Sequence, residues 1–148
     1  MPKLSFQSLE IRKGVHISKD DIKPYGCIVV RPNSLFVDHF TGNTCISSEH
    51  IIATNKGSKE DYLRKGEVLI VATGIVGKCY PIRKNFPIPV IANQLFVILK
   101  SNKKINLLRL FEDVQFVEKL NSSLIKISEG TAVKRINLEK LKNLSFEW

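Results

Sequence analysis

The chain has 148 residues, of which 43% are hydrophobic and 25% are charged, with 23 lysines and arginines against 14 aspartates and glutamates. This length and composition are typical of a globular protein with a real core, and we expect residues 1–148 to form a single domain. The formal net charge of +9 favours a polyanionic partner such as nucleic acid, because surplus positive charge attracts phosphate.

The cysteines and the N-terminal residues exclude several other classes of protein. Cys27, Cys45 and Cys79 are widely spaced and form no Cys-x-x-Cys pair, so neither a disulfide framework nor a thiolate zinc site is predicted. We expect free thiols in a reducing cytoplasm. The chain opens without the apolar segment of a signal peptide, and no apolar run reaches transmembrane length. These features predict a cytoplasmic protein that does not contact a membrane.

The first part of the chain carries strand and turn signals. Ser18 is placed to cap a loop or a single helical turn over residues 17–22. Strands are expected at residues 27–30, 35–40 and 45–53, the last as a return strand after a Thr-Gly-Asn turn.

Residues 63–78, with the sequence Leu-Arg-Lys-Gly-Glu-Val-Leu-Ile-Val-Ala-Thr-Gly-Ile-Val-Gly-Lys, are the most informative segment. The first four residues predict a tight turn in which Gly66 adopts a positive φ. Residues 68–72 are continuously apolar, which predicts a short strand covered on both faces. Residues 73–78 then bring together backbone N–H groups, a hydroxyl and a charge. This combination predicts an anion site.

The rest of the chain changes from strand to helix signals. Residues 87–99 form a long apolar run, and its two prolines limit its start to a sheet edge or a bulge. Residues 105–122 carry apolar side chains at nearly helical spacing, with a break expected near Asp113. Asn137 is a suitable N-cap for a last helix over 138–143. The expected fold is α+β, with a mixed or antiparallel sheet in the first two-thirds and helices in the last third.

A basic segment follows the glycine-rich turn. Residues 78–104 contain six lysines or arginines and no acid, and Lys134-Arg135 form a second basic spot. Arginine can read guanine, and asparagine or glutamine can read adenine, which adds Gln94 and Asn137 as candidate base-reading residues. We therefore predict that DNA is contacted by Thr73, Lys78, Arg83, Lys84, Asn85, Asn93, Lys134 and Arg135.

The glycine-rich turn can also be compared with two known phosphate-binding motifs and with a plain β-turn. A nucleotide-binding P-loop requires glycine at position 72 and serine or threonine at 79, where this chain has Ala72 and Cys79. A Gly-x-x-Gly clamp on single-stranded nucleic acid joins two helices, whereas a strand leads into this turn. The simplest alternative is a plain β-turn whose two glycines supply positive φ.

Catalysis finds little support in the sequence. His16, His39 and His50 lack metal-ligand spacing, and Asp38-His39 with Cys45 is a poor nucleophile arrangement because neighbouring strand residues face opposite ways. Acidic pairs such as Asp20-Asp21 are typical of loops. We therefore expect no catalytic residue, metal or cofactor.

Several of these segments, in this order, resemble one known family. Residues 66–70 with 74–78 are similar to the "G-D-hydrophobic-hydrophobic…G…G-K" core of target recognition domains in type I restriction-modification specificity subunits. Residues 92–95 resemble the following strand of that family. Residues 105–121 resemble its leucine-rich segment, and residues 128–144 resemble its closing "S-x-G-[ST]…L-x-x-L-x-x-L" segment.

The resemblance implies sequence-specific binding of double-stranded DNA, with chemistry performed by partner methyltransferase and restriction (nuclease) subunits. Family members usually carry two recognition domains joined by long helices. These 148 residues contain one domain and no coiled-coil heptads, so we expect the isolated domain to be a monomer. The alternative is a module of the same fold that docks a DNA methyltransferase or another protein instead of DNA. A nuclease remains a further alternative, although no carboxylate cluster with recognisable spacing supports it.

Overall fold

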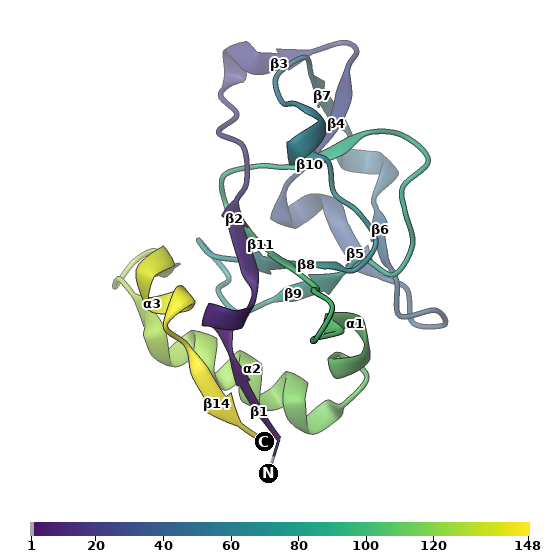
Figure 1. Cartoon of the computed structure of the whole chain (residues 1–148). Coiled ribbons are helices and arrows are strands. Elements are labelled where there is room, and N and C mark those ends of the chain that lie inside the picture. Colours follow the sequence, from purple (N-terminus) through teal and green to yellow (C-terminus); the bar gives the residue numbers. More distant parts are fainter. Residues whose placement is uncertain (1) are drawn as a thin grey trace.

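The computed structural model describes residues 2–148 and has the expected α+β architecture. Figure 1 shows helices on one side of a central sheet and a second β layer on the other side. The helices are α1 (Leu107–Leu110), α2 (Val114–Ile127) and α3 (Leu138–Lys142). All three lie in the C-terminal third, which confirms the predicted distribution of helices.

The central sheet is antiparallel, with strand order β2-β11-β8-β9. In the register of its inner pair, Ile70 lies opposite Val97 and Leu69 lies opposite Ile98. The strands are β2 (Glu10–Lys13), β11 (Phe96–Lys100), β8 (Glu67–Val71) and β9 (Cys79–Pro81).

The second β layer is a mixed sheet in the order β10-β4-β7-β3, in which only the β10–β4 pair is parallel. Its strands are β10 (Val90–Ala92), β4 (Cys27–Val30), β7 (Ile52–Thr54) and β3 (Ile22–Lys23). Three strand pairs complete the structure: β1 (Lys3–Ser5) with β14 (Ser145–Glu147), β5 (Leu35–Val37) with β6 (Thr44–Ile46), and β12 (Ser128–Glu129) with β13 (Arg135–Ile136).

Single 3-10 turns connect several strands. They are η1 (Phe6–Ser8), η2 (Lys19–Asp21), η3 (Pro32–Ser34), η4 (Ser48–His50) and η5 (Lys59–Asp61). None of the helices within residues 2–148 has the length and apolar character needed to cross a membrane.

Strand β8 separates two hydrophobic clusters. Val68 and Ile70 belong to the cluster that includes Phe116, Leu120 and Leu124 of α2. Leu69 and Val71 instead belong to the cluster on the other face, which extends to the second β layer. Because side chains alternate across a strand, a strand whose every residue is buried must be covered on both faces. The predicted two-sided burial of this segment is confirmed.

The helix boundaries lie at the predicted break near Asp113 and at the predicted N-cap Asn137. Asp113 separates α1 from α2, and its Oδ1 accepts hydrogen bonds from the N–H groups of Gln115 and Phe116. Asn137 Oδ1 accepts from Glu139 and Lys140 N–H at the start of α3. Short polar side chains satisfy backbone donors that the first turn of a helix leaves unpaired.

Three predicted strands differ in the structure. The strand expected at 45–53 is two strands, β6 and β7, separated by a turn in which Ser47 Oγ accepts from Glu49 N–H. The strand expected at 35–40 ends at Val37 because Asp38 begins a turn. The apolar run 87–99 is broken between β10 and β11 by Asn93, whose side chain accepts a hydrogen bond from Leu95 N–H. Local side-chain bonds of this kind compete with strand ladders.

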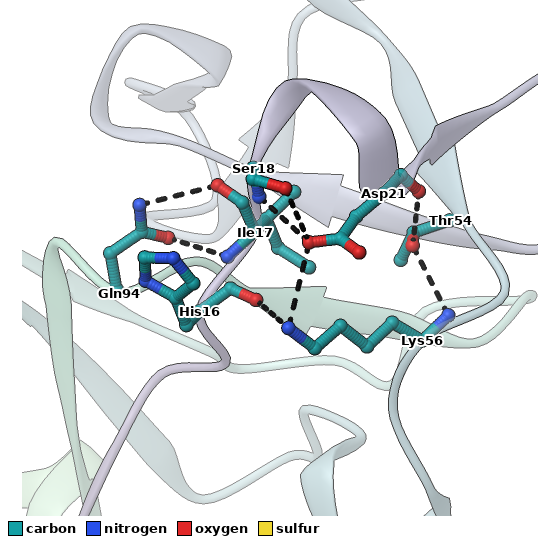
Figure 2. A network of polar contacts seen from close by, with 7 residues as sticks. All are labelled: His16, Ile17, Ser18, Asp21, Thr54, Lys56 and Gln94. Atoms are coloured by element: carbon teal, nitrogen blue, oxygen red, sulfur yellow. Dashed lines mark hydrogen bonds and ion pairs between the residues drawn. The ribbon is translucent and has the colours of Figure 1, made fainter.

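A polar network joins the segment after β2 to the second β layer (Figure 2). Asp21 Oδ2 accepts from Ser18 N–H at 2.8 Å and from Lys56 Nζ at 3.5 Å, while Lys56 Nζ also donates to the His16 carbonyl. Thr54 Oγ1 donates to the Asp21 carbonyl. The hydrogen bonds from Ser18, helped by the charge of Lys56, hold the pKa of Asp21 below its ordinary value.

The two faces of β8 can be tested separately. Leu69→Ala and Ile70→Ala each remove a fully buried side chain from a different cluster, so each should lower the free energy of unfolding by about 2–5 kcal/mol in urea titrations. Val114→Ala, at a side chain that is 68% exposed, should change it by no more than about 0.5 kcal/mol. A small effect at either buried position would contradict two-sided burial.

The Asp21 network predicts a pH dependence of stability. A carboxylate whose pKa is lowered by folding contributes stability above the ordinary aspartate pKa and loses it as the pH falls through the folded-state pKa. Asp21→Asn should therefore lower the melting temperature at neutral pH. As the pH falls, the melting temperature of this variant should decrease less than that of the wild type. Asp20→Asn, at the exposed neighbouring residue, is the control. If the melting temperatures of wild type and Asp21→Asn fell equally with decreasing pH, the stabilising role of the Asp21 carboxylate would be contradicted.

Candidate nucleic-acid interface

The glycine-rich turn, residues 73–78, joins the central strand β8 to the edge strand β9. Gly74 has φ of 102° and Gly77 has φ of 93°, which confirms that both provide conformations disfavoured for other residues. Gly77 also lies against α2, where Asn121 Nδ2 donates to its carbonyl at 3.0 Å. The turn is therefore held by the helix as well as by its two strands.

Three of the six backbone N–H groups of this turn are bonded within the protein. Gly74 N–H donates to the Lys134 carbonyl, Val76 N–H to the Gly74 carbonyl, and Gly77 N–H to the Val71 carbonyl. A backbone anion cradle requires free N–H groups that converge on one point. These three N–H groups are therefore engaged within the fold, and the anion site expected here stays a prediction that depends on the remaining groups of the turn and on the charge of Lys78.

Lys78 is the exposed cation at the end of the turn. Its Nζ lies 5.6 Å from the centre of the buried Tyr80 ring, a position favourable for a cation–π contact. The next residue, Cys79, packs against the helical cluster, and burial raises the pKa of its thiol to about 12. Cys79 is thus a neutral thiol at pH 7, while Lys78 supplies the charge.

A second loop lies beside the glycine-rich turn. Arg135 forms an isolated antiparallel bridge with Thr73, and Ile136 N–H donates to the Ala72 carbonyl at 2.7 Å. Together with the Gly74–Lys134 hydrogen bond, these contacts bring three sequence-predicted site residues to one place: Thr73 at the start of the turn, and Lys134 and Arg135 about sixty positions later in the chain. Lys78 lies at the other end of the turn.

A surface hollow of about 340 Å³, here called the β9 hollow, extends from the turn along β9 to the β5–β6 hairpin and α2. Its two charged lining residues are Lys78 and Arg83, and both are cations. Its other lining residues are Val37, Gly42, Gly77, Cys79, Pro81, Phe111, Val117 and Asn121. The hollow therefore combines positive charge with apolar walls.

Arg83 is half-buried and has contacts within the fold. Its Nε donates to the Gly42 carbonyl and its Nη1 donates to the Leu108 carbonyl, with Glu112 Oε1 3.9 Å from Nη1. These bonds tie the β5–β6 hairpin to α1. The sequence led us to expect a side chain free to contact DNA, and the structure gives Arg83 an anchoring role instead.

The other predicted residues differ in how free their polar groups are. Lys84 is exposed, and Asn85 accepts a hydrogen bond from Lys65 N–H. Asn93 is only 6% exposed, and its Oδ1 stabilises the turn before β11. Gln94 exchanges two hydrogen bonds with the backbone of Ile17, as Figure 2 shows. Several side-chain amides of a type that can read bases thus form hydrogen bonds within the protein. The same is true of Asn137, which caps a helix.

The tip of the β5–β6 hairpin is a feature that sequence reasoning missed. Phe40 is 98% exposed there, and it follows Asp38, whose side chain accepts hydrogen bonds from Phe40 N–H and Thr41 Oγ1. The available signal was a phenylalanine inside an otherwise polar turn. Asp38 is engaged within this turn, and Cys45 Sγ is directed to the Asn43 carbonyl, so neither is arranged with His39 as a catalytic group.

Among the side chains that the structure describes, which do not include that of His50, no group of three or more His, Cys, Asp or Glu could hold a metal ion. The exposed cations beside the glycine-rich turn are Lys78, Lys134 and Arg135, and Glu129, which pairs with Lys140, lies opposite Arg135 in the β12–β13 pair.

Comparisons with known proteins identify the fold. No protein-family model and no curated protein matches the chain. Among the solved structures that do match are two S subunits. One is the type I restriction-modification system S subunit from M. genitalium, with a TM-score of 0.60 and 19% identity over 97% of this chain and 33% of that one. The other is the HsdS subunit from Thermoanaerobacter tengcongensis, with a TM-score of 0.65 and 16% identity over 97% of this chain and 32% of that one.

These likenesses confirm the sequence-based resemblance at the level of fold. The chain spans about a third of the length of each S subunit it matches. Both comparisons extend over 97% of this chain.

The two glycines should respond differently to substitution. A β-branched residue at positive φ is strained by about 1–2 kcal/mol, so Gly74→Val and Gly77→Val should both lower the melting temperature. A Cβ at Gly77 would also meet Asn121 Nδ2 at 3.4 Å, whereas one at Gly74 meets nothing within 4 Å. Thermal unfolding should therefore show the larger loss for Gly77→Val. Wild-type melting of that variant would contradict the argument.

Proposed function

We propose that this chain is a DNA target recognition domain of a restriction-modification specificity protein and that it binds double-stranded DNA without catalysing a reaction. The observation that carries the proposal is the fold shared with type I S subunits over 97% of the chain, in a protein of net charge +9. A surface rich in lysine and arginine is the usual electrostatic basis of duplex binding.

The proposed contact surface centres on the glycine-rich turn and the β9 hollow. Lys78, Lys84, Lys134 and Arg135 are exposed and would neutralise phosphates, while Thr73 and Asn85 lie beside them. Phosphate contacts position a protein on DNA, and side chains that reach base edges give specificity. Arg83 contributes by holding the hairpin at the rim of the hollow. Asn93 is assigned to its turn and not to DNA.

The proposed partners follow the same reasoning. In a restriction-modification assembly, methyltransferase and restriction subunits would supply the chemistry. We propose that this domain alone is a monomer with no cofactor and that it acts in the cytoplasm, where its DNA would lie. The competing function is a protein-interaction module of the same fold, which the salt dependence of binding separates from DNA recognition.

The proposal is tested by selecting bound duplexes from a random pool and then titrating the recovered duplex at several salt concentrations. Each phosphate contact contributes about 0.9 to the slope of log affinity against log salt. Lys78→Ala, Lys84→Ala and Lys134→Ala should each weaken binding and reduce that slope by about 0.9 if the lysine contacts phosphate.

Lys23→Ala is the matched control, because Lys23 is an exposed lysine on β3 in the second β layer. It should leave the slope unchanged. Failure to recover any duplex would reject the DNA function, while unchanged slopes in all three interface variants would place the contact surface elsewhere.

A further inference from the structure

We propose that Phe40 at the tip of the β5–β6 hairpin inserts its ring against a base step of the bound duplex. This inference rests on the proposed DNA-binding function and assigns one residue a defined role in it. Three observations support this inference. The aromatic ring is almost fully exposed, hydrogen bonds fix the turn that carries it, and a cationic surface lies beside it.

The hairpin tip is built as a rigid support. Asp38 N–H donates to the Asn43 carbonyl at 2.9 Å, and Gly42 N–H donates to the Asp38 carbonyl at 2.8 Å. The Asp38 carboxylate accepts from Phe40 N–H at 3.0 Å and from Thr41 Oγ1 at 3.1 Å. These bonds fix the backbone on both sides of Phe40. Asp38 is also the only acid in residues 38–43, and both of its carboxylate oxygens accept bonds there.

The support is anchored to the rest of the fold. Arg83 N–H donates to Asn43 Oδ1 at 3.0 Å, and the Arg83 guanidinium bonds the Gly42 carbonyl. Thr44 Oγ1 donates to the Pro81 carbonyl at 2.6 Å. The hairpin is thus joined to the end of β9, and Figure 1 shows it projecting from the body of the molecule.

The Phe40 ring has no packing role in this chain, since 98% of its surface is exposed. Phe36 and Val37 on the same hairpin are also exposed, at 50% and 39%. A rigid apolar tip binds with little loss of conformational freedom, because its order exists before binding. The tip is therefore suited to enter an apolar environment supplied by a partner.

Charge identifies that partner as DNA. The β9 hollow reaches the hairpin at Val37 and Gly42, and its charged lining residues are Lys78 and Arg83. Arg83 is engaged by the Gly42 and Leu108 carbonyls and lies 3.9 Å from Glu112, so it anchors the hairpin. The cations exposed beside the hairpin are therefore Lys78 and Lys84, which follows Arg83 in the chain. A cationic surface beside an apolar wedge is the arrangement by which phenylalanine, leucine and similar residues enter DNA between base steps while nearby cations hold the phosphates.

The test uses the duplex recovered from the random pool. Phe40→Ala should raise Kd by about 5- to 140-fold, the loss expected when one base–aromatic stack is removed. Phe40→Trp should retain affinity, since its ring can still stack. The salt slope should be the same in both variants, because no phosphate contact is removed. Melting temperatures should match the wild type, since the side chain is exposed.

Tyr25→Ala is the matched control, because Tyr25 is 75% exposed in the turn between β3 and β4 and lies in the other β layer. It should leave Kd unchanged. A duplex series with 2-aminopurine at successive positions gives the direct readout. Wild type and Phe40→Trp should change its fluorescence at one base step, and Phe40→Ala should not.

The outcomes separate this inference from the proposed function. Tight wild-type binding with an unchanged Kd for Phe40→Ala, or with no altered base step, would reject insertion and leave DNA recognition intact. Absence of duplex binding by the wild-type protein would reject both.

Discussion

Burial of strand β8 on both faces is the constraint on which the rest of the structure depends. A strand with alternating side chains in two hydrophobic clusters needs a cover on each side. The chain meets this need with α2 and its neighbours on one face and with a second β layer on the other. The ends of β8 then emerge at the surface, and the glycine-rich turn at one end lies where a ligand can reach it.

This arrangement gives different roles to different positive charges of the chain. Arg12 pairs with the buried Glu67, Lys56 pairs with Asp21, and Arg83 holds the hairpin. These cations maintain the fold. The lysines beside the glycine-rich turn and the β9 hollow remain exposed, so they are available to phosphate. Net charge alone could not distinguish these roles, because the distinction depends on which carbonyl or carboxylate each side chain meets.

The sequence predicted the fold well where the cause was local. The buried strand, the helix break near Asp113, the Asn137 cap and the positive φ of Gly74 and Gly77 all follow from residue type and periodicity. The division of 45–53 into two strands did not, because Ser47 forms a turn that the apolar pattern conceals.

For the site, the sequence identified the turn and its basic neighbours. The pairing of Thr73 with Arg135 was not predictable from one chain, since it depends on tertiary contacts. The same holds for the internal use of the N–H groups of Gly74, Val76 and Gly77. Asn93 and Gln94 have residue types suited to base recognition, yet their hydrogen bonds are formed within the fold. Residue type therefore indicated which side chains are suited to contact DNA. Tertiary packing decides which of these side chains face solvent.

We propose that the glycine-rich turn, the neighbouring basic loop and the β5–β6 tip form one DNA-contacting surface. Amide chemical-shift mapping by NMR, with the selected duplex added in steps, tests this most directly. We expect shifts confined to residues 38–43, 73–78, 83–85 and 134–135, with the network around Asp21 and Lys56 unaffected. Shifts centred on that network, with the glycine-rich turn unchanged, would contradict it.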